Sequence, residues 1–416
     1  TGSNNVAVGR TALSSNTTAS NNTAVGFEAM NGNTTGTQNN AFGGQALDAN
    51  TTGNHNNAFG VNTLGANTTG ESNSGFGRGA LQSNTTASNN TAIGSLALNA
   101  NTTGTLNTAV GANALDANTT GDSNVAIGNE ALSANTTADN NTAVGRQSML
   151  LNTTGANNTA LGHEALEANT TASNNTALGY EALTANTTGT ENTAIGAEAL
   201  DSNTTGNYNT AIGYAAGKNN TTGGPWTFVG WQAGFNKGDG GSGEGTAVGY
   251  QALYASGGPL RNTAVGYQAL YNTTNYGDSN TGVGYQVIKA NTTGANNTAL
   301  GKSALNANTT GTGNSATGAD SLGSVTTGSQ NTAIGISTGY EIVTGSNNLL
   351  LGYNAGRSSS PSGGIVNGSN SVVLGNNNIT DLFCADTSIS SSDSRDKTDV
   401  ADFNIGLTWI NALRPV

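Results

Sequence analysis

The sequence predicts an all-β fold, a parallel β-solenoid of about 22 coils. Glycine recurs every seventeen residues from Gly9 to Gly230, and asparagine stands four residues before it from Asn5 to Asn209. Charged residues make up only 9% of the chain, which separates it from most disordered proteins. A fixed period kept over so many residues is typical of stacked coils, because each coil must match the one beneath it.

Each coil contains two short apolar segments separated by turns. Asn22-Thr23-Ala24-Val25-Gly26 is representative, and its β-branched and apolar residues favour a strand. Ala114-Leu115 and its equivalents predict a second strand on the other side of the coil. The Asn-Thr-Thr-Gly segment predicts a turn, since asparagine and glycine accept left-handed backbone conformations. Although each Asn-Thr-Thr is formally a glycosylation sequon, we interpret it first as turn chemistry.

The strand of each coil is expected to be buried on both sides. Ala24 and Val25 are both apolar and point to opposite sides of the strand. We expect the larger side chain to fill the coil interior and the smaller one to face a closely approaching second copy. The pattern therefore predicts an oligomer whose coils pack around an axis.

Two polar columns are expected to stabilise the stack. Asparagines four residues before glycine would lie about 4.8 Å apart in successive coils, so their amides would form a ladder that sets the register. The threonine pairs, such as Thr17-Thr18, are expected to form a similar ladder.

The composition excludes several classes of partner. The net charge is −12, with only 12 Lys and Arg residues, so no basic cluster is present for nucleic acid. No apolar run is long enough to cross a membrane. The two histidines stand far apart, and we expect no metal and no cofactor.

The period loosens after Gly230, which divides a regular shaft at 1–235 from a less regular shaft at 236–375. Extra residues predict inserted loops at 236–244, 256–261, 272–278 and 357–368. Aromatic residues concentrate in the same part of the chain. They form a candidate contact for a host glycan or protein receptor, or they pack irregular coils together: Trp226, Trp231, Tyr250, Tyr254, Tyr267, Tyr271, Tyr276 and Tyr285. Tyr250, Tyr267 and Tyr285 follow successive coil glycines and are expected to stack.

Three glutamates raise the question of catalysis. Glu164, Glu181 and Glu198 occupy the same position in successive coils, which would place their carboxylates about 5 Å apart, as in retaining glycosidases. Such a stack is more often a solvated face, and nothing near it desolvates one glutamate to make it the acid. A polysaccharide-degrading activity is therefore the less favoured interpretation.

The repeat stops near residue 376. Residues 376–391 predict a connecting strand or linker, and residues 392–416 are polar and then helical. Ile405, Trp409, Ile410 and Leu413 form a helical stripe that Pro415 ends.

The repeats, such as Asn124-Val125-Ala126-Ile127-Gly128, resemble the head repeat of trimeric autotransporter adhesins over about residues 1–375. That family forms a left-handed parallel β-roll that trimerises. The resemblance therefore implies a homotrimeric rod and the left-handed sense of the coil.

The C-terminal stretch resembles a second family. Ser392, Asp393, Arg395 and Lys397, followed by Gly-Leu-x-x-Ile-Asn-x-Leu-Arg-Pro-Val, are similar to the start of the intramolecular chaperone domain of phage tail spikes and fibres, the endosialidase-type peptidases. The resemblance implies a small α+β domain that trimerises the fibre and then cuts itself off once. It implies Ser392 as nucleophile and Lys397 as its base, with Asp393 and Arg395 as motif residues. Apart from this single turnover, we expect no enzymatic activity.

Together these observations predict the shaft of a homotrimeric tail fibre that attaches a phage or virus to its host. The expected location is the virion tail, and the expected partners are copies of the chain, a host glycan or receptor, and other virion tail proteins. A bacterial surface adhesin with the same repeats is the alternative, and a polysaccharide-degrading tail spike is less favoured.

Overall fold

The structure is a computed structural model that describes residues 2–236, 243–257, 261–274 and 276–381. The chain divides into two compact units, Thr1–Asn376 and Asn377–Val416. Most of the second unit, including the predicted chaperone start at 392–416, lies outside the described residues. The first unit contains the repeats and is described below.

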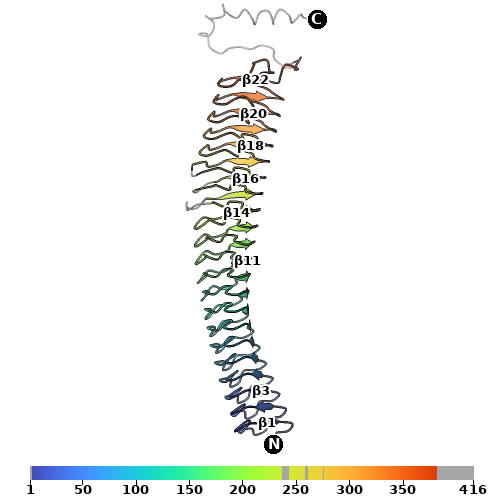
Figure 1. The fold of residues 1–416 in the computed structure, drawn as a ribbon, viewed down its shortest axis with the longest axis vertical. Coiled ribbons are helices and arrows are strands. Elements are labelled where there is room, and N and C mark those ends of the chain that lie inside the picture. Colours follow the sequence, from blue (N-terminus) through green and yellow to red (C-terminus); the bar gives the residue numbers. More distant parts are fainter. Residues whose placement is uncertain (1, 237–242, 258–260, 275, 382–416) are drawn as a thin grey trace, which may run out of the picture. The chain divides into compact units, whose positions relative to one another are not determined.

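The first unit is a parallel β-solenoid in which each coil contributes one strand (Figure 1). Successive strands pair in parallel and in register, so that Ala24 lies beside Ala41 and Ala109 beside Ala126. The predicted fold class and the seventeen-residue period are therefore confirmed, and no α-helix occurs within the described ranges. The sheet consists of β1 (Val6–Val8), β2 (Thr23–Val25), β3 (Asn40–Phe42), β4 (Asn57–Phe59), β5 (Ser74–Phe76), β6 (Thr91–Ile93), β7 (Thr108–Val110), β8 (Val125–Ile127), β9 (Thr142–Val144), β10 (Thr159–Leu161), β11 (Thr176–Leu178), β12 (Thr193–Ile195), β13 (Thr210–Ile212), β14 (Trp226–Val229), β15 (Gly245–Val248), β16 (Thr263–Val265), β17 (Thr281–Val283), β18 (Thr298–Leu300), β19 (Ser315–Thr317), β20 (Thr332–Ile334), β21 (Leu349–Leu351) and β22 (Val372–Leu374).

The predicted second strand of each coil is wrong. The Ala-Leu segment lies in consecutive turns in which alternate residues adopt positive φ, as at Glu181 (51°) and Leu183 (57°). Its backbone still bonds to the next coil, since the Leu183 N–H donates to the Ala199 carbonyl at 2.9 Å. Each left-handed non-glycine residue costs roughly 1–2 kcal/mol, which these hydrogen bonds between coils offset. Nothing in an alternation of apolar residues distinguishes this conformation from a strand.

The expected orientation of the strand is also wrong. Ala24, in the middle of β2, is fully buried in the coil interior, whereas Val25 points outward. The interior is filled by this alanine together with the Ala29-Met30 pair of the turn, which other coils replace with Ala-Leu. Because the Ala-Leu pair already occupies the narrow coil, only a small strand residue fits opposite it.

The coil glycine is required by both conformation and space. Gly128 has a φ of 139°, and a Cβ there would lie 2.4 Å from the carbonyl oxygen of Gly145 in the next coil. L-residues rarely adopt this φ, and the neighbouring backbone atom cannot move away without separating the coils. The glycine repeat therefore marks the corner at which successive backbones approach most closely.

The predicted asparagine ladder is confirmed. The Asn124 side chain accepts the Asn141 N–H at 3.0 Å and donates to the Ala138 carbonyl at 2.8 Å. A second buried column comes from the Asn-Thr-Thr turns, where Asn118 donates to Asn101 at 2.9 Å. The threonines of these turns also bond from coil to coil. Since the sequon asparagines from Asn33 to Asn203 are buried, they hold the turns together and are not exposed for glycosylation in the folded chain.

One section of the core repacks where the leucine is missing. Gly217 and Gly234 replace the leucine in two successive coils, and Phe228 replaces the alanine of the strand between them. A Cβ at either glycine would lie within 2.6 Å of the Phe228 ring, so the ring fills the space of both leucines. Trp226 takes the place of the ladder asparagine and is also buried, stacked on Phe228 at 5.4 Å.

Candidate interaction surfaces

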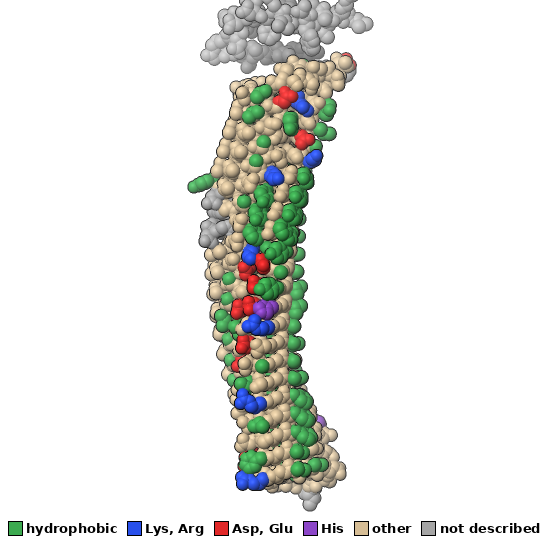
Figure 2. Space-filling view, in the orientation of Figure 1, with side chains coloured by type: hydrophobic (Ala, Val, Ile, Leu, Met, Phe, Trp, Pro, Cys, Tyr) green, Lys and Arg blue, Asp and Glu red, His purple; other side chains and the backbone are tan. Residues whose placement is uncertain are grey.

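The residue before each coil glycine forms one continuous column on the outside of the sheet, here called the outer ladder. Figure 2 shows hydrophobic side chains following one edge of the coils along their length. Ile93, Leu161 and Ile334 are 43%, 44% and 50% exposed. The outer ladder consists of Val8, Val25, Phe42, Phe59, Phe76, Ile93, Val110, Ile127, Val144, Leu161, Leu178, Ile195, Ile212, Val229, Val248, Val265, Val283, Leu300, Thr317, Ile334, Leu351 and Leu374.

The outer ladder is large enough to be an interface. A half-exposed aliphatic or aromatic side chain leaves roughly 50 Å² of apolar surface in water, so the ladder presents on the order of 1,000 Å². Soluble monomers rarely expose contiguous apolar patches above a few hundred Å², and a stable interface takes about 800 Å² from each partner. Within the column, Phe42, Phe59 and Phe76 stack at 4.8 Å, so the ladder is ordered before any partner covers it.

A second surface, here called the variable face, is formed by the residues one, two and five positions after each coil glycine. Arg146 and Glu164 show that the first two columns are neighbours, with nitrogen and oxygen 3.7 Å apart. Lys218 and Glu198 join the second and third columns at 2.5 Å. Packing and ladder bonds determine most other positions of the coil, so differences between coils concentrate here.

The glutamates considered for catalysis lie in a section of the variable face here called the acidic section, which consists of Glu164, Glu167, Glu181, Glu198 and Asp201. Glu164 lies beside Arg146 and beside His163 at 3.5 Å, and Glu198 binds Lys218. Burial raises the pKa of Glu167, and the nearby Glu164 carboxylate adds to the rise. Two of the three glutamates are therefore paired with basic side chains.

Burial also raises the pKa of Asp201 in the same section, although Lys218 opposes the rise from 3.8 Å away. Glu181 and Glu198 add to it because their negative charges disfavour a further carboxylate. The acidic section therefore carries a surplus of negative charge that its two nearby basic residues, Arg146 and Lys218, do not neutralise.

The aromatic section of the variable face follows the acidic section along the chain. Tyr214, Trp231, Tyr250, Tyr267 and Tyr285 occupy the first column, and each stacks on the next at 5.8, 4.9, 5.0 and 5.1 Å. The predicted stacking of the last three tyrosines is thereby confirmed. In the third column, Tyr254 stacks on Phe235 at 5.2 Å and on Tyr271 at 5.0 Å.

A ladder of glutamine amides runs beside the aromatic columns. Gln251 donates to Gln232, Gln268 to Gln251, and Gln286 to Gln268, each at 3.0 Å. Sequence reasoning did not predict this ladder or the roles of Tyr214 and Phe235. The signal was present, because a Gln follows the aromatic residue after four successive coil glycines.

The stacking determines which parts of the aromatic side chains are exposed to solvent. Each inner ring has both faces covered by its neighbours, so Tyr250 and Tyr267, 40% and 41% exposed, offer their edges and hydroxyls. Trp226 does not belong to this surface, since only 1% of it is exposed within the core. Tyr276 lies in an inserted loop and is the most exposed of the predicted set, at 77%.

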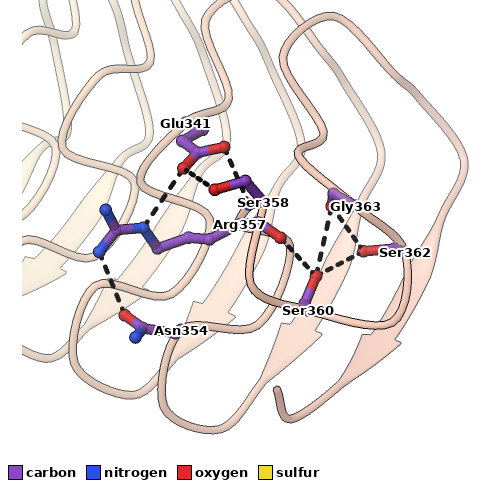
Figure 3. A network of polar contacts seen from close by, with 7 residues as sticks. All are labelled: Glu341, Asn354, Arg357, Ser358, Ser360, Ser362 and Gly363. Carbon is purple, nitrogen blue, oxygen red and sulfur yellow. Dashed lines mark hydrogen bonds and ion pairs between the residues drawn. The ribbon is translucent and has the colours of Figure 1, made fainter. Parts of the chain in front are cut away.

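The inserted loop at 357–368 is closed by its own hydrogen bonds (Figure 3). The Glu341 carboxylate accepts the Ser358 N–H at 3.0 Å and its hydroxyl at 3.1 Å. The Ser360 hydroxyl donates to the Arg357 carbonyl at 2.8 Å and lies 2.8 Å from the Ser362 hydroxyl. These polar groups hold the loop against its coil and are already occupied.

The remaining predicted site residues lie outside the described residues: Ser392, Asp393, Arg395 and Lys397. Within the described ranges, no group of three His, Cys, Asp or Glu side chains could hold a metal ion. The described part of the chain also has no helix long and apolar enough to cross a membrane. A scan against protein-family models and a search of curated proteins found no match.

Proposed function

We propose that this chain is the shaft of a homotrimeric fibre, in which copies of the chain cover each other's outer ladders. The outer ladder, which is apolar at every position except Thr317, carries this proposal, because a ladder of this length left in water would promote uncontrolled association. The sequence pattern predicts that the smaller residue of the strand faces a second copy. The larger residue, such as Val25, points outward instead, so the proposed contact between copies is made by the larger side chains. The trimeric state is what the resemblance to autotransporter adhesin heads implies.

The function proposed for the fibre is attachment of a phage or virus to its host. A stack of coils holds a binding surface at a distance, and three chains turn weak contacts into avidity. The resemblance of residues 392–416 to tail-fibre chaperones supports a location in the virion tail, beside other tail proteins. A bacterial surface adhesin with the same repeats remains the alternative proposal.

The aromatic section of the variable face is the proposed contact with a host glycan or receptor protein. Exposed tyrosine edges and glutamine amides provide apolar surface and hydrogen-bonding groups with no net charge. The test is binding of the labelled shaft to a panel of bacterial cells. The double variant Tyr250→Ala/Tyr267→Ala should lose most of the binding, whereas Tyr340→Ala, outside the section, should keep it. Equal binding by the unchanged shaft, the double variant and Tyr340→Ala would reject this contact.

We also propose that Ser392 and Lys397 carry out a single self-cleavage in the full-length fibre. A neutral lysine would accept the serine proton as the serine oxygen attacks the scissile carbonyl. The peptide C–N bond would then break as the lysine proton passes to the leaving amine, and water would hydrolyse the resulting ester. Ser392→Ala should leave the fibre uncut on a denaturing gel, whereas Ser390→Ala should not. Normal cleavage of Ser392→Ala would remove this assignment.

A further inference from the structure

The first column of the variable face has one missing ring. Tyr180 stacks on His163 of the preceding coil at 5.6 Å, and Tyr214 stacks on Trp231 of the following coil at 5.8 Å. Between them, the same position is occupied by Ala197. Ring-bearing residues therefore flank an alanine, and the two tyrosine faces that point toward it have no ring against them.

The spacing leaves room for one ring. Two coil rises of about 4.8 Å separate the coils of Tyr180 and Tyr214, so a ring placed over Ala197 would have the spacing of the existing stack. Tyr180 is 51% exposed, more than Tyr267, which has rings on both sides and is 41% exposed, and Tyr214 on the other side of the space is 42% exposed. We call the space between Tyr180 and Tyr214 the ring slot.

Carboxylates stand beside the ring slot. Glu181 and Glu198 occupy the neighbouring column in the coils of Tyr180 and Ala197. Interaction with the Glu181 carboxylate raises the pKa of the Tyr180 hydroxyl, and Glu164 and Glu198 add to the rise. The Lys218 ammonium contacts Oε2 of Glu198, and Oε1 is not part of this ion pair.

The surrounding charge favours a cation. On this part of the variable face the acids outnumber the bases, with Glu164, Glu167, Glu181, Glu198 and Asp201 against Arg146 and Lys218. A cation held against tyrosine faces gains from their electron-rich surfaces as well. An acidic sugar would be repelled, and a neutral sugar would gain only from contact with the rings.

We propose that the ring slot binds an amino sugar of a host surface glycan, with the sugar ring between Tyr180 and Tyr214 and its ammonium group toward Glu181 and Glu198. This proposal rests on the proposed attachment function and adds a ligand class and a site to it. The CH groups on the two sides of the pyranose would contact the two tyrosine faces. The ammonium protons would donate to the carboxylate oxygens.

The test is calorimetric titration of the full chain with a glucosamine tetrasaccharide and with its N-acetylated counterpart. The two ligands have the same sugar rings but differ in charge. The free amine should bind at least tenfold more tightly than the acetylated form. Equal binding of the two ligands, or no binding of the amine, would overturn the proposal.

A matched pair of variants locates the site. Ala197→Tyr completes the stack and fills the slot, so it should abolish binding of the amine, while Ala112→Tyr, at the same position of a distant coil, should leave binding unchanged. Binding that survives Ala197→Tyr would also overturn the proposal. Circular dichroism and light scattering on the same samples establish that each variant is folded. If the chain is trimeric but the amine does not bind, only the slot proposal fails; a monomeric mass counts against the shaft proposal instead.

Discussion

Replacing Asn124 with alanine tests whether the asparagine ladder holds the coils together. The Asn124 side chain makes three hydrogen bonds: it accepts the Asn141 N–H at 3.0 Å and donates to the Ala138 carbonyl at 2.8 Å and to Asn107 Oδ1 at 3.2 Å. Asn124 is fully buried, so water cannot replace these partners in the intact coil.

The expected cost follows from which partners are left without a hydrogen bond. The Ala138 carbonyl still accepts from Asn135 at 3.1 Å, and Asn107 Oδ1 still accepts the backbone N–H of residue 124 at 2.9 Å. Only the Asn141 N–H loses its acceptor. One buried unsatisfied donor costs about 1–3 kcal/mol, and two lost hydrogen bonds add about 0.5–1.5 kcal/mol each. We therefore expect Asn124→Ala to lower the local free energy of unfolding by about 2–6 kcal/mol.

Amide hydrogen exchange measured by mass spectrometry is the suitable assay, because solenoids open locally. Peptides covering 107–141 should exchange faster in Asn124→Ala, while peptides near residue 330 should not change. The control is Asn129→Ala in the same coil, where an exposed side chain makes one hydrogen bond to the Ala112 carbonyl at 3.1 Å. If the two variants differ by less than about 0.5 kcal/mol, the ladder does not stabilise the stack as described.

Three further predictions follow from the core, the coil corner and the acidic section. Phe228→Ala should lower the free energy of unfolding, measured in urea, by about 3–5 kcal/mol. Adding Gly217→Leu and Gly234→Leu to this variant should restore most of the lost stability. If stability is not restored, the Phe228 ring does not substitute for the two leucines. Gly128→Ala should lower the free energy of unfolding by about 3 kcal/mol or more, because the φ of 139° and the Gly145 carbonyl oxygen 2.4 Å from the new Cβ both oppose a side chain. A thermal midpoint equal to that of the unchanged chain would contradict this prediction. The raised pKa of Asp201 means that the folded chain holds its proton more tightly than the unfolded chain, so the stability contribution of this group falls as pH rises above the ordinary value of 3.8 and through the folded pKa. Asp201→Asn should therefore raise the thermal midpoint at pH 7 relative to the unchanged chain and have little effect near pH 3, and a lower midpoint at pH 7 would reverse the sign of this argument.

Much of the architecture could be predicted from the period alone. The spacing of the coil glycines determines the register between neighbouring strands, and the ladder asparagines are recognisable because they recur with the same spacing. Stacking of Tyr250, Tyr267 and Tyr285 followed from the same reasoning, since equal positions in neighbouring coils lie one above another. Periodicity specifies which residues are neighbours along the stack.

Periodicity does not specify which way a residue points within a coil. Ala24 and Val25 are both apolar, so alternation could not tell which one fills the interior. The answer depends on the volume left by the Ala-Leu pair, and that pair adopts alternating left-handed conformations that no residue preference indicates. The burial of Trp226 could not be predicted for a related reason, because it depends on the next coil, where a Cβ added at Gly245 would lie 2.3 Å from the Trp226 ring.

The outer ladder also predicts how an oligomer would be broken. Ile93→Glu combined with Ile127→Glu would place two charges in each copy of the interface, and the assembled state should dissociate. The matched control, Ser95→Glu combined with Asn129→Glu, adds the same charge to the variable face of the same coils and should leave assembly intact. Equal dissociation of both variants would indicate a general charge effect.

The mass of the purified shaft in solution, measured by light scattering, tests the central claim most directly. Burial of the outer ladder between copies predicts an oligomer, and the trimer that the resemblance implies would have a mass of three times 41.2 kDa. A particle of 41.2 kDa that remains monomeric at high concentration would contradict the account, because the apolar ladder would then be stable in water without a partner.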